Sequence, residues 1–171
     1  YQATSGDFLF KGQPVSVKKP LDAQRLGLSV VHQELKLVET LSIAENIFLG
    51  RPHSSNGLVK WKDMRAEAQK LVDDLNIKLD VTEEVSRLSV AQKQIVETCK
   101  ALSFNAELII MDEPSASLTD NELKCLFDII YHLRERGITV IYISHRMEEV
   151  FKIADTVTVL RDGMHVDTLP V

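Results

Sequence analysis

Residues 108–114 read LIIMDEP, four apolar residues followed by two adjacent carboxylates and a proline. This run, like residues 138–143, is apolar at nearly every position, which is typical of strands covered on both faces in parallel sheets flanked by helices. Ligands of open α/β sheets bind at the carboxyl ends of such strands, where this run delivers Asp112 and Glu113. An ordinary acidic turn explains the two carboxylates equally well, so the neighbouring segments decide between the two interpretations.

Outward from this strand, the apolar patterning predicts an α/β core interrupted by a helical insertion. Strands are expected at residues 28–32, 107–111, 138–143 and 156–160, with a hairpin formed by residues 7–10 and 14–17. Helices are expected at residues 64–76, 89–104, 119–136 and 146–154, and a Ser-x-x-Glu capping box at residues 42–45 marks one more. From residue 107 onward, strands and helices alternate as in a right-handed parallel sheet. Residues 51–57 are expected to form a surface loop.

The composition argues against two classes of protein and predicts no cysteine chemistry. With 20 basic and 25 acidic residues, the net charge of −5 does not suit a surface that binds a nucleic-acid backbone. The longest apolar runs stop well short of the roughly 18 residues that a membrane-spanning helix needs. Cys99 and Cys125 lie inside helical patterns without metal-ligand spacing, which predicts core thiols in a reducing compartment.

Further polar residues follow other predicted strands of the same sheet. Gln33 and His145 each come just after the end of such a strand. Each alone is typical of a surface residue, but the carboxyl ends of parallel strands converge on one crevice, so Gln33, Asp112 and His145 are expected to share a site. Ser89 and Gln92 form a second capping box, whose free amides can bind an anion but which is also complete as a structural cap.

Together these segments resemble the nucleotide-binding domain of ATP-binding cassette (ABC) transporters over essentially all 171 residues. They correspond to the Q-loop (residues 31–34, VHQE), the signature (88–92, LSVAQ), Walker B (108–113, LIIMDE), the D-loop (within 114–119, PSASLT) and the H-loop (142–145, YISH). The resemblance implies an α/β, P-loop NTPase-like fold: a mostly parallel sheet flanked by helices, an antiparallel hairpin and a helical subdomain. We expect one partial domain with three parts, residues 1–36, 37–104 and 105–171.

The resemblance implies a role for each residue at the strand ends. Asp112 would hold Mg²⁺, partly through water, and Glu113 would be the general base for the attacking water. His145 would contact the γ-phosphate of ATP. Gln33 would reach the metal or the water and sense the membrane partner.

The signature and the D-loop are implied to act on the ATP of an opposite cassette. Ser89, Val90, Ala91 and Gln92 would bind its γ-phosphate, and Thr119 would belong to the same nucleotide site. Ala91 stands where the family normally has glycine, which lets the backbone approach phosphate closely. Thr119 stands where many cassettes have aspartate, although the sugar importers often have another residue there.

One motif of the family is missing from these residues. No G-x-x-x-x-G-K-[ST] pattern occurs, and the seven glycines are scattered along the chain. That loop supplies the amides and the lysine that hold the nucleotide phosphates, and in this family it would lie upstream of Tyr1. We therefore expect an N-terminally truncated cassette that binds ATP very weakly and does not turn it over by itself.

Three functions follow from the resemblance. Residues 31–35, 41–51 and 143–150 are similar to monosaccharide importers of the ribose and galactoside type, whose ATPases fuse two cassettes, and the chain resembles the N-terminal one. The first function is thus an ATP-hydrolysing subunit, peripheral at the cytoplasmic face of the inner membrane. Its partners would be a second cassette, permease subunits and, indirectly, a periplasmic sugar-binding protein. The alternative is a non-hydrolysing pairing or regulatory module, and a soluble cassette in DNA repair or translation fits least.

Overall fold

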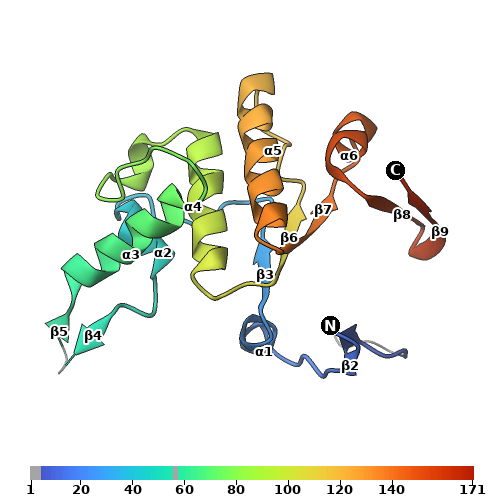
Figure 1. Ribbon diagram of the computed structural model, residues 1–171, viewed down its shortest axis with the longest axis horizontal. Coiled ribbons are helices and arrows are strands. Elements are labelled where there is room, and N and C mark those ends of the chain that lie inside the picture. The colour runs from blue at the N-terminus through green and yellow to red at the C-terminus, as the bar shows by residue number, and fades with distance from the viewer. Residues whose placement is uncertain (1–4, 56–57) are drawn as a thin grey trace.

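Three parallel strands form the central sheet of the computed structural model, which describes residues 5–55 and 58–171. They are β3 (Leu28–Val31), β6 (Leu108–Asp112) and β7 (Thr139–Ile143), in the order β3-β6-β7. In this register Asp112 pairs with Ile143, so the carboxyl ends of the strands lie at one edge of the sheet (Figure 1). The parallel arrangement predicted for these three strands is confirmed.

Two long helices pack on one face of this sheet. α4 (Val90–Leu102) lies against β3 and α5 (Asp120–Glu135) lies against β7, and Ile109 between them is completely buried. The other face of β7 is open, because Ile141 and Ile143 are each 45% exposed. The prediction that residues 138–143 are covered on both faces is therefore wrong: α4 and α5 lie on the same side of the sheet, and the described residues leave the other side of β7 open to solvent.

Helices α4 and α5 begin at capping boxes that the sequence predicts. At α4, Oγ of Ser89 accepts a hydrogen bond from the Gln92 amide at 3.3 Å, and the Gln92 side chain accepts one from the Ser89 amide at 2.9 Å. At α5, the Glu122 carboxylate accepts from the Thr119 amide at 3.0 Å. These bonds satisfy amides that have no partner inside the helix, which fixes where each helix starts.

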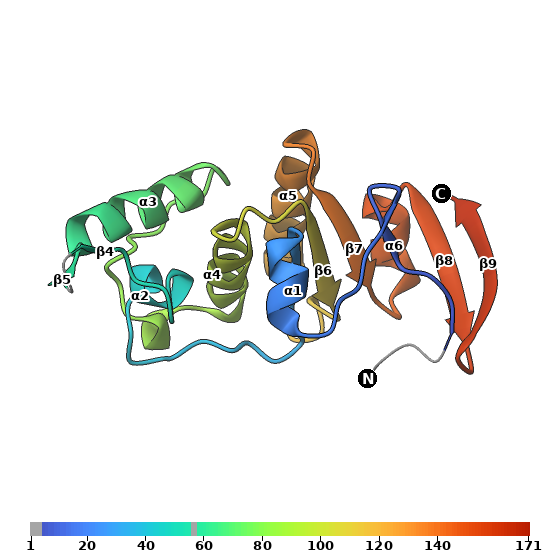
Figure 2. The same ribbon diagram turned by 90° about the horizontal axis from the view of Figure 1, so that it is seen from below.

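A helical part extends from one end of the sheet (Figure 2). It contains α2 (Ile43–Ile47), α3 (Trp61–Asp73) and the 3-10 helix η1 (Val85–Arg87). It also contains a hairpin of β4 (Ser54–Ser55) and β5 (Leu58–Val59). Part of the loop expected at residues 51–57 is therefore a strand, and Asn56 and Gly57 lie outside the described residues. Within residues 5–55 and 58–171, no helix has the length and apolar character that crossing a bilayer requires.

The N-terminal hairpin is confirmed but is shorter than expected. β1 (Leu9–Phe10) pairs with β2 (Gln13–Pro14) in antiparallel fashion. One further bond, from the Val15 amide to the Phe8 carbonyl at 2.9 Å, extends the pairing beyond the strands. The short helix α1 (Pro20–Arg25), which the sequence analysis did not predict, begins at a proline that suits the first turn of a helix.

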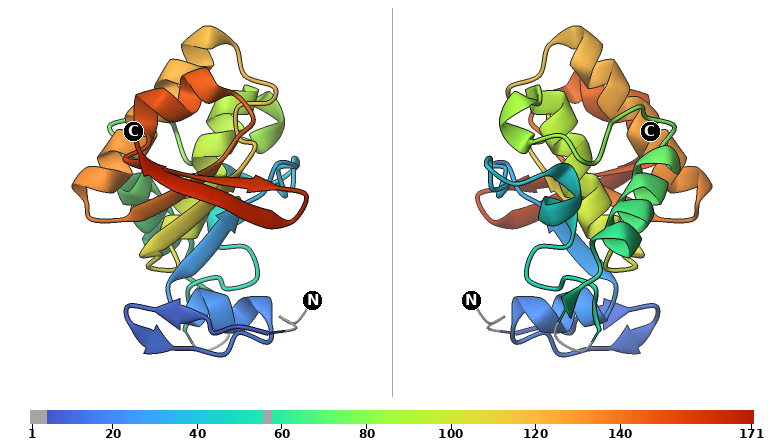
Figure 3. Two further views of the ribbon diagram at one scale, coloured as in Figure 1. Left: turned by 90° about the vertical axis from the view of Figure 1, so that its right-hand side faces the viewer. Right: turned by 90° about the vertical axis from the view of Figure 1, so that its left-hand side faces the viewer.

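The chain ends in a two-stranded ribbon at the end of the molecule opposite the helical part (Figure 2). In the left view of Figure 3 this ribbon crosses in front of the rest of the chain. After α6 (Met147–Ile153), β8 (Thr156–Arg161) pairs with β9 (Met164–Pro170) and with no strand of the parallel sheet. The expectation that residues 156–160 extend the parallel sheet is therefore wrong. The Asp162-Gly163 turn, whose φ values of +52° and +76° suit a two-residue antiparallel hairpin, explains why β8 pairs with the strand that follows it.

Candidate active site

Strand β6 delivers its two carboxylates at the carboxyl edge of the sheet, as the sequence predicts. Asp112 is the last residue of β6, and the Glu113 amide donates to the Ile143 carbonyl at 3.0 Å, which continues the pairing with β7 by one residue. Glu113 has a φ of +48°, in the left-handed region. Such a conformation costs a residue other than glycine about 1–3 kcal/mol and is concentrated at functional sites.

The side chain of Glu113 contacts the histidine at the end of the neighbouring strand. Nδ1 of His145 lies 2.9 Å from both Oε1 and Oε2 of Glu113. The Glu113 side chain is 22% exposed and the His145 ring is 76% exposed, so the pair sits at a surface that a ligand can reach. In the tautomer that carries its proton on Nδ1, His145 donates to the carboxylate and turns Nε2 toward a second partner.

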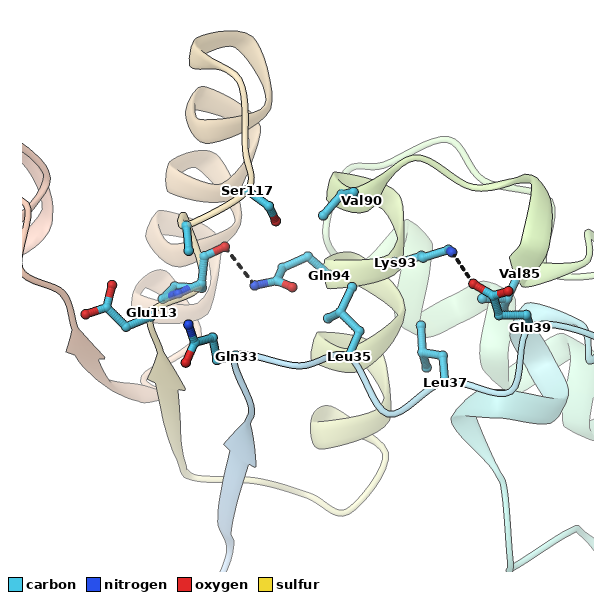
Figure 4. Close-up of a pocket in the computed structure, with 12 residues that line it drawn as sticks. Gln33, Leu35, Leu37, Glu39, Val85, Val90, Lys93, Gln94, Glu113 and Ser117 are labelled. Atoms are coloured by element: carbon cyan, nitrogen blue, oxygen red, sulfur yellow. Dashed lines mark hydrogen bonds and ion pairs between the residues drawn. The ribbon is translucent and has the colours of Figure 1, made fainter.

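Gln33 and Glu113 line one cavity of about 270 Å³. Three segments that are distant in sequence meet there: the residues after β3, the first turns of α4 and the residues after β6 (Figure 4). Val90 contributes from α4, so the cavity touches the predicted signature, Q-loop and Walker B segments together. The residues expected to share a site are Gln33, Asp112 and His145. The structure brings Gln33 and Glu113 together at the cavity and His145 into contact with Glu113, whereas Asp112, the last residue of β6, does not line the cavity.

The first turn of α4 lies beside the first turn of α5. The pKa of Glu122 is lowered by hydrogen bonds from the amide and hydroxyl of Thr119 and, to a smaller extent, from the Ala91 amide and the Ser89 hydroxyl. Ser89, Ala91 and Gln92 all lie in this exposed or half-buried turn. The predicted signature and D-loop residues therefore lie close together, at the first turns of α4 and α5.

Two side chains of α4 that the sequence does not mark as candidates hydrogen-bond to the segments that follow β3 and β6, both of which line the cavity. Nε2 of Gln94 donates to the Pro114 carbonyl at 3.0 Å (Figure 4). Oε1 of Glu97 accepts from the Lys36 amide at 3.0 Å. Both side chains are buried. A sequence signal was available, because Gln94 and Glu97 are three residues apart and Gln94 adjoins the apolar face of the helix.

The oxygen donors at this edge of the sheet suit Mg²⁺ better than a metal ion that is coordinated by protein side chains alone. Within the described part of the chain, no three His, Cys, Asp or Glu side chains form a metal cluster. Mg²⁺ in nucleotide sites uses one or two protein ligands and takes its other ligands from phosphates and water. The Asp112 carboxylate and the Gln33 amide, at the same edge of the sheet, match that requirement.

Comparison with known sequences identifies the family to which these segments belong. The family model described as ABC transporter matches residues 1–116. The chain is 48% identical over 169 residues to a putative ribose/galactose/methyl galactoside import ATP-binding protein of Hahella chejuensis. It is 44% identical over 169 residues to the ribose import ATP-binding protein RbsA 2 of Escherichia coli O157:H7. It is 44% identical over 171 residues to the galactose/methyl galactoside import ATP-binding protein MglA of Pasteurella multocida.

These alignments cover 98–100% of this chain but only 33–34% of each relative, so the chain spans about a third of their length. Solved structures agree on the fold. A nucleotide-free ATP-binding cassette from an ABC transporter superposes with a TM-score of 0.81 at 26% identity, covering 99% of this chain and 71% of the other. An ATP-binding cassette of an ABC transporter in its ADP conformation gives a TM-score of 0.83 at 21% identity, covering 100% and 71%.

Proposed function

The chain belongs to the ABC transporter family of ATP-binding proteins, and we propose that the protein that carries it hydrolyses ATP to power the import of a monosaccharide. The observation that carries the proposal is the contact between His145 and Glu113, a residue that lines one cavity together with Gln33 and Val90. The printed names of the ribose and galactoside relatives support the substrate class.

Within this proposal, Glu113 accepts a proton from the attacking water, because its carboxylate lies at the sheet edge where the reacting phosphate arrives. The contact with Nδ1 orients His145 so that Nε2 faces the γ-phosphate. Asp112 and Gln33 would hold Mg²⁺. Bound there, the metal would neutralise phosphate charge and so favour attack on the terminal phosphorus.

We further propose that Ser89, Val90, Ala91 and Gln92, together with Thr119, act on the ATP held by a second cassette. A helix of 13 residues presents the positive end of its dipole to an anion at its first turn. Hydrolysis would then require two cassettes that face each other.

The other proposed partners follow from the transport role. The helical part at residues 37–104 would dock on permease subunits, and a periplasmic sugar-binding protein would act indirectly through that permease. The protein would then lie at the cytoplasmic face of the membrane. The phosphate-binding loop would come from sequence outside these 171 residues, which contain no G-x-x-x-x-G-K-[ST] pattern.

A second candidate is a cassette that pairs with or regulates another without hydrolysing ATP. Reconstitution separates the two functions. The full-length protein that carries these residues would be combined with its permease in vesicles that contain ATP and Mg²⁺. Uptake of a labelled monosaccharide that requires ATP, and that is lost in a Glu113→Gln variant, supports the ATPase. Uptake that is unaffected by Glu113→Gln supports the pairing module.

A further inference from the structure

A buried carboxylate in α6 gathers side chains from both segments that carry the candidate catalytic pair. Glu149 is only 2% exposed. Its Oε2 accepts hydrogen bonds from the hydroxyls of Ser115 at 2.7 Å, Tyr142 at 2.7 Å and Ser144 at 3.3 Å. Its Oε1 lies 2.6 Å from Nη1 of Arg146, in an ion pair that does not have the geometry of a hydrogen bond. Four side chains therefore compensate one buried negative charge.

The partners of Glu149 flank Glu113 and His145 in the chain. Ser115 comes two residues after Glu113, whereas Ser144 and Arg146 come directly before and after His145. Ser144 is itself fixed, because its Oγ accepts from the Arg146 amide at 3.0 Å. The carboxylate is thus a junction between the turn after β6 and the turn after β7, and neither Glu113 nor His145 touches it directly.

We propose that Glu149 is a positioning residue, which holds these two turns in the one arrangement that brings Glu113 and His145 together. This inference rests on the proposed function, in which that pair acts in hydrolysis. A buried carboxylate is costly unless it is paired and hydrogen-bonded, so the network has one strongly preferred arrangement. The exposed His145 ring has no comparable packing of its own, and its backbone must be fixed by its neighbours.

The pKa of Tyr142 is raised, chiefly by burial and also by its hydrogen bond to the Glu149 carboxylate. The phenol therefore stays protonated and remains a donor to Glu149. Tyr142→Phe removes this one donor while it keeps the ring and the charge of Glu149. It is therefore a milder perturbation than any change at Glu149 itself.

The test compares Glu149→Gln with Glu148→Gln in the full-length protein. Both residues lie in the first turn of α6, but Glu148 is exposed, so the two changes remove the same helix-terminal charge and differ in the buried network. For Glu149→Gln we expect kcat for ATP hydrolysis to fall about 10- to 100-fold with KM changed less than about 2-fold, as small misplacements of reacting groups cause. Glu148→Gln should match the wild type, and Tyr142→Phe should give an intermediate kcat.

A second measurement does not depend on activity. Hydrogen exchange, followed on peptides that cover residues 112–118 and 142–149, should be faster in Glu149→Gln than in Glu148→Gln, because the two turns loosen. If Glu149→Gln loses thermal stability but keeps wild-type kcat, or if exchange is unchanged in both turns, the positioning role is overturned. If the wild type and Glu113→Gln hydrolyse ATP equally, the proposed function fails instead, and the exchange result still decides whether Glu149 holds the turns.

Discussion

Nδ1 of His145 lies 2.9 Å from each carboxylate oxygen of Glu113, although 32 residues separate them in sequence. The contact crosses between the ends of two adjacent parallel strands, where the backbone of Glu113 also bonds to β7. The left-handed φ of Glu113 turns the residue away from the regular alternation of β6. Backbone strain at the candidate base is therefore accompanied by a specific side-chain contact, as expected for a site shaped for chemistry.

Removal of the Ser89 hydroxyl should lower ATPase activity by more than the loss of a helix cap explains. Ser89→Ala loses the cap of α4, which should lower the free energy of unfolding by about 0.5–2 kcal/mol. It should also lower kcat/KM for ATP by at least about 10-fold, since a hydrogen bond to a charged phosphate is worth about 1.5–3 kcal/mol. Denaturant unfolding and steady-state hydrolysis measure the two effects separately.

Ser42→Ala is the matched control for that variant. Oγ of Ser42 accepts from the Glu45 amide at 3.3 Å, the same distance as in the cap of α4, but Ser42 begins the helix α2 in the helical part. This variant should lose similar stability and keep its ATPase activity. If both variants lost the same amount of activity, Ser89 would act only as a helix cap and would not bind phosphate.

Ala91→Gly should leave hydrolysis unchanged or faster. Ala91 is half-buried in the first turn of α4, and removal of its Cβ lets the backbone come closer to a phosphate. The substitution should cost about 0.5–1 kcal/mol of stability, because glycine is a poor helix former. Hydrolysis rates of the full-length variant measure this effect, and a large loss of activity would mean that the methyl group itself is needed.

Cys99 should be unreactive while the protein is folded. Burial raises the pKa of its thiol to about 12, and the thiolate is the reactive form. Because the folded pKa lies above the unfolded value near 9, this thiol contributes stability below about pH 9 that is lost as the pH rises toward 12. Alkylation at pH 8.5 should label the half-buried Cys125 in the native protein and label Cys99 only after denaturant is added. Equal native labelling of both thiols would contradict the burial of Cys99.

Sequence patterns predicted the elements that position the site. The apolar run at residues 108–111 is a central strand, and the boxes begun by Ser42, Ser89 and Thr119 all start helices. These predictions succeeded because they rest on simple rules: the periodicity of apolar residues, the capping of helices, and the position of the carboxyl ends of parallel strands at one edge of the sheet. The prediction that Gln33, Asp112 and His145 share a site rests on the last of these rules; the structure instead brings Gln33 to a cavity with Glu113, and Glu113 to His145.

The features that the sequence did not reveal depend on which elements pack together. The apolar run at residues 138–143 does not tell whether a helix covers Ile141. In the structure this side chain is exposed, because α4 and α5 lie on the opposite face of the sheet. The antiparallel ribbon of β8 and β9 had a local signal in Asp162-Gly163 that was overlooked. The Glu149 network had only a weak sequence signal: Glu149 lies four residues before Ile153, on the buried side of α6. The hydrogen-bond partners of Glu149 could not be predicted, because they come from β7 and from the turn after β6.

The central claim is that Glu113 is the base of an ATP-hydrolysing site. The most direct measurement is single-turnover hydrolysis of ATP by the full-length protein and by its Glu113→Gln variant, each with Mg²⁺, together with equilibrium binding of ATP. We predict that Glu113→Gln binds ATP at least as tightly as the wild type and hydrolyses it at least about 100-fold more slowly, as loss of a general base requires. Hydrolysis by Glu113→Gln at close to the wild-type rate would contradict the account.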